Sequence, residues 1–66
     1  MTTKEIEERF DLKKILAEET DLILCRAIYL RFFRRWSWTK IAVDIGGGNT
    51  PDNIRRIVNR YFEKML

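Results

Sequence analysis

The sequence has no histidine, a single cysteine and a single proline. With one thiol the chain cannot form an internal disulfide, and without histidine it lacks the usual donors for a zinc site. No run approaches the ~20 apolar residues of a membrane helix, and the first residues contain no apolar signal-peptide core. We therefore expect a cytoplasmic protein with no membrane segment, in which Cys25 acts as a small buried hydrophobe.

The same shortages argue against catalysis. Acid–base and nucleophilic chemistry commonly uses histidine, a reactive thiol or a pair of carboxylates in a pocket, and none of these is evident. A chain of 66 residues forms one domain, residues 1–66, whose small core leaves little room for a ligand. The Gly46–Gly48 run has no preceding strand and no following lysine, so it does not fit a nucleotide loop. We expect a protein that is not an enzyme and has no cofactor.

Charge is divided unevenly along the chain. Residues 1–21 carry four basic and seven acidic side chains, a net charge of −3, whereas residues 22–66 carry nine basic and three acidic ones, a net charge of +6. A basic region attached to an acidic leader is typical of a protein with one face that meets phosphates. Charge alone is equally compatible with an ordinary solvated surface.

The pattern predicts an all-α protein, a small three- to four-helix bundle that contains a helix-turn-helix. No segment alternates apolar and polar residues as a strand would. The expected segments are an acidic leader helix (1–21), a support helix (22–35), a first helix of the helix-turn-helix (37–45) and a recognition helix (50–65). Helix-start signals support them: a capping-box spacing at Thr2 and Glu5, Ser37 as a cap, and Thr50 followed by proline. Because Asp11 is a second potential cap, the leader is either one bent helix or two pieces.

Apolar spacing indicates which faces turn inward. For the support helix we expect the inward stripe Leu22, Ile23, Ala27, Leu30 and Phe33, and the outward residues Arg26, Arg31 and Arg34. For the next helix we expect the apolar face Trp38, Ile41, Ala42 and Ile45, ended by the glycines. For the recognition helix we expect the stripe Ile54, Ile57, Val58, Tyr61, Phe62 and Met65.

The residues opposite this last stripe are suited to double-stranded DNA. The candidate DNA-binding residues are Asn53, Arg55, Arg56, Asn59, Arg60, Ser37, Thr39 and Lys40. Arginine can bond guanine and asparagine can bond adenine in a bidentate manner, so Arg56 and Asn59, at the centre of the face, are the expected base readers. Arg55 and Arg60 flank them and suit phosphates. Asn53 lies in the first turn of the recognition helix. Ser37, Thr39 and Lys40, at the start of the preceding helix, are expected to meet the DNA backbone beside the groove.

One region of the chain resembles a known family. The stretch from Arg31 to Ala42, RFFRRWSWTKIA, resembles the start of the helix-turn-helix of sigma factor region four. The continuation from Ile45 to Arg56, IGGGNTPDNIRR, is similar to small sigma-region-four-like proteins carried by phages and prophages of Gram-positive bacteria. The resemblance covers about Leu22 to Phe62.

The resemblance implies a DNA-binding fold of three or four helices, with Asn53, Arg55, Arg56, Asn59 and Arg60 in the recognition helix. It also implies a phage-type transcriptional regulator. The turn departs from the family pattern: its glycine comes in register at Gly46, but the apolar pair arrives two residues late, at Ile54 and Ile57. The acidic leader is not explained by the resemblance.

A second reading of the sequence is a protein-interaction module. A phage-encoded helix-turn-helix can be reused to inhibit a host protein that handles nucleic acid, for example as an anti-CRISPR. Trp36, Phe32 and the acidic leader would then form the contact surface. A homodimer is a further expectation, because many helix-turn-helix proteins read two half-sites as dimers.

Overall fold

The computed structural model describes all 66 residues, and its backbone is entirely helix, turn and loop. Five α-helices follow one another along the chain: α1 (Thr3–Arg9), α2 (Leu12–Glu18), α3 (Leu22–Ile28), α4 (Trp38–Ile45) and α5 (Pro51–Glu63). A π-helical segment, η1 (Tyr29–Phe33), continues directly from α3. The predicted all-α class is confirmed, and the number of helices is five because the leader forms two of them.

The leader divides at Phe10 and Asp11. Thr2 and Glu5 form the predicted capping box at the start of α1, and the Asp11 side chain accepts a hydrogen bond from the backbone N–H of Lys14 at 3.2 Å. Phe10, between the two helices, has an extended backbone with φ of −123° and ψ of 145°. Of the two alternatives that the sequence left open, the structure therefore shows two helices rather than one bent helix.

The α-helical part of the support segment is shorter than expected, and its buried side differs in part from the predicted one. Asp21 caps α3, and regular α-helix ends at Ile28, where η1 takes over with the wider hydrogen bond from Arg34 N–H to the Tyr29 carbonyl. Three residues expected inside are exposed: Leu22 by 81%, Ile23 by 49% and Phe33 by 41%. The buried side chains of this segment are Leu24, Ala27, Ile28, Leu30 and Phe32.

Arg31 lies on the inward side of this segment, whereas the sequence pattern predicted it outside. Leu24, Ala27, Ile28 and Arg31 have the spacing i, i+3, i+4 and i+7, so they share one side of the helix. Of the five residues that the sequence interpretation placed inside, Ala27 and Leu30 are buried, whereas Leu22, Ile23 and Phe33 are exposed. In the structure Arg31 is only partly exposed, and its guanidinium donates hydrogen bonds to the Thr3 hydroxyl and the Trp36 carbonyl.

The remaining helices follow their predicted faces more closely. Met65, predicted in the inward stripe, is nevertheless 47% exposed and lies beyond the end of α5 at Glu63. Ser37 caps α4, which buries Ile41 and Ala42, with Trp38 and Ile45 packed beside them. Gly46 ends α4 at a φ of 69°, in the left-handed region that glycine tolerates. Thr50 caps α5 and Pro51 is its first residue.

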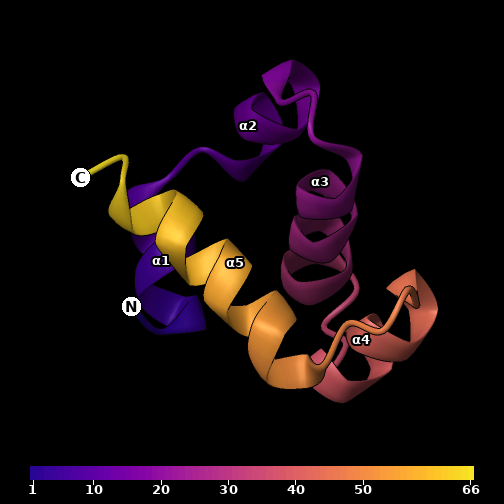
Figure 1. Cartoon of the computed structure of the whole chain (residues 1–66). Helices are drawn as coiled ribbons and strands as arrows, with labels where there is room; N and C mark the ends of the chain where they lie inside the picture. The colour runs from indigo at the N-terminus through magenta and orange to yellow at the C-terminus, as the bar shows by residue number, and fades with distance from the viewer.

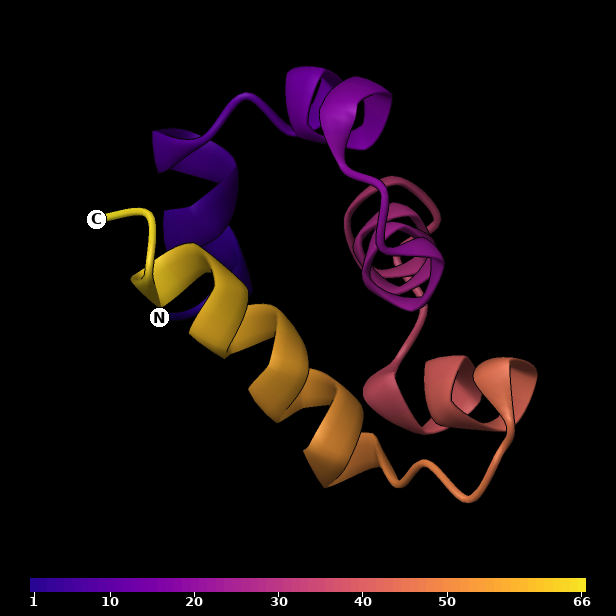
Figure 2. The same ribbon diagram turned by 45° about the horizontal axis from the view of Figure 1, so that its top comes forward.

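The helices enclose one small core of twelve buried residues, all apolar. Phe62 of α5 joins the aromatic side chains of this core. The centroid of its ring lies 4.9 Å from that of Phe10 and 6.0 Å from that of Phe32. Figures 1 and 2 show the chain ends together, beside α1 and the end of α5, while the glycine turn lies at the other end of α5. No helix is both long enough and apolar enough to cross a membrane.

Candidate nucleic-acid interface

Helix α5 has one completely buried side. Ile54, Val58 and Phe62 are all 0% exposed, and their spacing of four residues places them in one row along the helix. Helix α5 contacts α3 and α4 (Figure 1), and near its C-terminal end the Phe62 ring contacts Phe10 and Phe32. The opposite side of α5 therefore faces solvent over its full 13 residues, a length of about 20 Å.

The outward side of α5 is polar throughout. It forms an open hollow without any apolar lining residue, bordered by Arg55, Arg56, Asn59, Arg60, Glu63 and Lys64. Four of the eight candidate residues, Arg55, Arg56, Asn59 and Arg60, are thus brought together on one surface. Lys64 completes this surface and was missed, although its position four residues after Arg60 places it on the same side of the helix.

Asp52 holds two of these arginines. Its Oδ1 accepts from Nη2 of Arg55 at 2.6 Å, and its Oδ2 accepts from Nη2 of Arg56 at 2.7 Å. All three side chains are at least half exposed. The hydrogen bond from Arg55 and the positive charges of both arginines lower the pKa of the Asp52 carboxyl. The spacing i, i+3 and i, i+4 is the sequence signal that would have revealed this contact.

Asn53 is tied to the turn that precedes α5. Its Nδ2 donates to Oδ1 of Asn49 at 3.1 Å, and Asn49 in turn donates through Nδ2 to the Gly46 carbonyl at 2.8 Å. Asn53 is nevertheless exposed. Its amide is therefore positioned at the first turn of α5, next to the glycine turn.

A second hollow, of about 350 Å³, lies between α3 and α5. Leu24, Ile57 and Tyr61 form its apolar part, and its polar border consists of Asn53, Arg56, Arg60 and Lys64. Ile57 was expected in the core shared by α4 and α5, but it is 37% exposed. The core row runs through Ile54 and Val58, so Ile57 falls at the margin of the packed side.

The three candidates at the start of α4 are exposed, and two of them already have structural roles. The Ser37 hydroxyl caps α4 by accepting from the Lys40 backbone N–H at 3.1 Å. Lys40 Nζ lies 4.1 Å from the centroid of the Trp36 ring, and Arg34 Cζ lies 5.7 Å from it. Trp36 therefore holds two cations beside the start of α4. The sequence interpretation missed Arg34 in this group.

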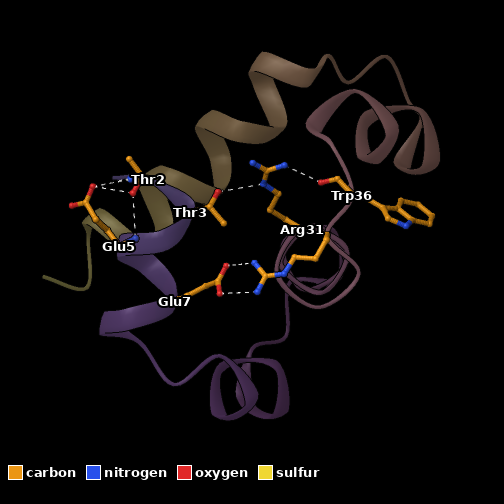
Figure 3. A network of polar contacts seen from close by, with 7 residues as sticks. Thr2, Thr3, Glu5, Glu7, Arg31 and Trp36 are labelled. Carbon is orange, nitrogen blue, oxygen red and sulfur yellow. Dashed lines mark hydrogen bonds and ion pairs between the residues drawn. The ribbon is translucent and has the colours of Figure 1, made fainter.

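Arg31 fixes the segment that leads into α4 (Figure 3). Its Nη1 donates to the Trp36 carbonyl at 2.9 Å and its Nε donates to Thr3 Oγ1 at 3.3 Å. The guanidinium also lies 4.7 Å from the centroid of the Trp38 ring. Nearby, Arg35 forms a two-pronged ion pair with Glu7 of α1. The acidic leader is thus attached to the segment that begins α4.

The contact surface expected for a protein-interaction module is only partly exposed in the structure. Trp36 is half-buried, but Phe32 is 4% exposed and belongs to the core. Its neighbours Tyr29 and Phe33 are the exposed aromatic residues, with stacked rings whose centroids lie 6.1 Å apart.

Cys25 is less buried than expected. It is partly exposed, and its Sγ donates a hydrogen bond to the Glu19 carbonyl at 3.3 Å. Burial is the main cause that raises the pKa of its thiol.

The comparisons with known proteins give no relative. No protein-family model, no curated protein and no solved structure matches this chain. No group of three or more acidic or cysteine side chains is arranged to hold a metal ion. The assignment of function therefore depends on the geometry and charge of the surface of α5.

Proposed function

We propose that the protein is a sequence-specific DNA-binding module that places α5 in the major groove. One observation carries the proposal: α5 has a fully buried apolar row on one side and a cationic, amide-bearing surface on the other. A major groove about 12 Å wide admits one α-helix, and arginine and asparagine are the side chains that read guanine and adenine there. The α4–glycine turn–α5 order is that of a helix-turn-helix.

In this proposal the side chains divide between reading and positioning. Arg56 and Asn59 contact base edges, and Asn53 joins them from the first turn. Arg55, Arg60 and Lys64 meet phosphates along the groove, and Lys40, with Ser37 and Thr39, meets the backbone beside it. The resemblance to sigma region four extends the proposal to a phage-type transcriptional regulator.

The test is DNA binding at several salt concentrations. The intact protein selects duplexes from a random pool, and fluorescence anisotropy then measures affinity for a selected duplex and a scrambled one. Each phosphate contact contributes about −0.9 to the slope of log K against log salt. We expect Arg60→Gln to make the slope less steep by up to about one. Lys14→Gln, an equal change of charge at an exposed site on α2, should leave the slope unchanged.

Base reading has a separate signature. Arg56→Gln should lower affinity for the selected duplex more than for the scrambled one, because a bidentate pair contributes about 1–3 kcal/mol of discrimination. If the intact protein binds no duplex even at low salt, the DNA-binding proposal is refuted.

The exposed Tyr29–Phe33 pair supports a second candidate function, a protein-interaction module, acting on a host protein or on a second copy. Aromatic side chains are enriched in protein interfaces relative to the rest of the surface. This function predicts that Phe33→Ala abolishes binding to the protein partner while Arg60→Gln leaves that binding intact. The reverse pattern, with duplex DNA as the partner, favours DNA binding.

A further inference from the structure

Asp52 is the one acidic side chain in the first turn of α5, and it lies among the proposed base-reading residues. Recognition helices contact base edges mainly with their N-terminal residues. An anion in this position opposes the phosphates of any duplex. Its carboxylate also occupies one Nη2 donor of Arg55 and one of Arg56, at 2.6 and 2.7 Å.

These contacts compete directly with nucleic acid. A phosphate or a guanine edge would approach the same guanidinium groups that Asp52 now contacts. Since all three side chains are at least half exposed, the ion pairs are weak enough to exchange with another anion. The hydrogen bond from Arg55 and the charges of both arginines lower the pKa of Asp52, so its carboxyl group is ionised when it faces them.

We propose that Asp52 is a specificity-determining residue: it withholds Arg55 and Arg56 from nonspecific phosphate contacts and releases them where its carboxylate finds a base-edge donor. The N4 amino group of cytosine is the donor in the major groove that carboxylates accept from. At such a site the loss of the ion pairs is offset by a new hydrogen bond. On duplexes without a cytosine at this position, the Asp52 carboxylate lies near the phosphates and gains no hydrogen bond to offset the repulsion. This inference rests on the proposed DNA-binding function.

Glu63 provides a matched control. It is exposed, it lies on the same outward surface of α5, and the structure shows no ion pair between it and an arginine. Asp52→Asn and Glu63→Gln remove the same charge from the same helix. Asp52→Glu keeps the charge and can still reach Arg55 and Arg56.

The experiment measures all four proteins against the selected and the scrambled duplex over a salt series. We expect Asp52→Asn to raise affinity for the scrambled duplex about tenfold or more, to steepen its salt slope by about one to two, and to reduce the ratio of selected to scrambled affinity. Glu63→Gln should change both affinities by a smaller and equal factor. Asp52→Glu should resemble the unaltered protein. Circular dichroism confirms that each variant is folded.

The outcomes separate the two proposals. If neither the unaltered protein nor Asp52→Asn binds any duplex, the DNA-binding function is refuted and this inference falls with it. If the unaltered protein binds DNA and Asp52→Asn behaves as Glu63→Gln does, only the role of Asp52 is overturned. The base-edge contact has its own test in Asp52→Ala, which removes the acceptor oxygens that asparagine would partly keep. If the unaltered protein prefers cytosine at one position and Asp52→Ala loses that preference, the contact is supported; an unchanged preference contradicts it.

Discussion

Replacing Phe62 with alanine tests whether the core is organised around this ring. Phe62 is fully buried at the end of α5 and contacts Phe10, between α1 and α2, and Phe32 of η1. The substitution removes the ring that joins these three segments. We expect a cavity that the surrounding helices close only in part.

The expected loss is large relative to the stability of the domain. Phenylalanine-to-alanine substitutions in a core cost about 3–5 kcal/mol. At roughly 0.05–0.15 kcal/mol per residue, a domain of this size has a free energy of unfolding of about 3–10 kcal/mol. Phe62→Ala should therefore remove about 30% of the stability or more. If the free energy of unfolding lies at the lower end of its range, a large fraction of the molecules will be unfolded. Phe62→Leu, which fills part of the space, should lose less.

The assay is urea denaturation followed by far-ultraviolet circular dichroism. Ile57→Ala is the control, because it lies on the same helix but is 37% exposed, and it should cost less than about 1.5 kcal/mol. The reasoning is refuted if Phe62→Ala and Ile57→Ala lower the free energy of unfolding by the same amount. Equal losses would mean that burial in this structure does not rank the contributions of the two side chains.

Two further predictions concern α4. Gly46 has a φ of 69° and a ψ of −151°, a conformation almost restricted to glycine, and an added Cβ would meet no atom within 4 Å. Gly46→Ala should therefore cost about 1–3 kcal/mol through backbone strain alone, seen as a lower Tm, while Val43→Ala at an exposed site should change it little; equal Tm values would contradict this. The hydrogen bond from Arg26 lowers the pKa of Asp44 below its ordinary 3.8, so the pair stabilises the fold above that pH and the contribution is lost as pH falls through the lowered value. The stability advantage over Asp44→Asn should shrink below about pH 4, and a constant difference down to pH 2 would show that the ion pair contributes nothing.

Local signals in the sequence were enough to predict most helix starts. Thr2 with Glu5, Ser37, and Thr50 with Pro51 act through side chains within three residues of the backbone groups they cap, so no tertiary information is needed. The predicted inward stripe of the support segment was wrong at Leu22, Ile23 and Phe33, because it depends on tertiary contacts. Arg31 turns inward because Thr3 and the Trp36 carbonyl accept its hydrogen bonds, and no local pattern shows that α1 approaches it.

The candidate site shows the same division. Spacing along α5 was sufficient to place Arg55, Arg56 and Arg60 on its outward side, because one regular helix with a strong apolar row determines both sides. The exposure of Ile57 depends on the direction from which α3 and α4 approach, which the sequence does not encode locally. The chain's DNA-reading role remains a prediction.

The positions of the two chain ends have a practical consequence for these experiments. Both ends lie far from the glycine turn, beside α1 and the last turn of α5 (Figures 1 and 2). A fluorophore or affinity tag attached at either end would therefore sit away from Asp52 and the first turn of α5. Such a label leaves the first turn of α5 open to a ligand, whereas Lys64, two residues before the C-terminus, lies close to a label at that end.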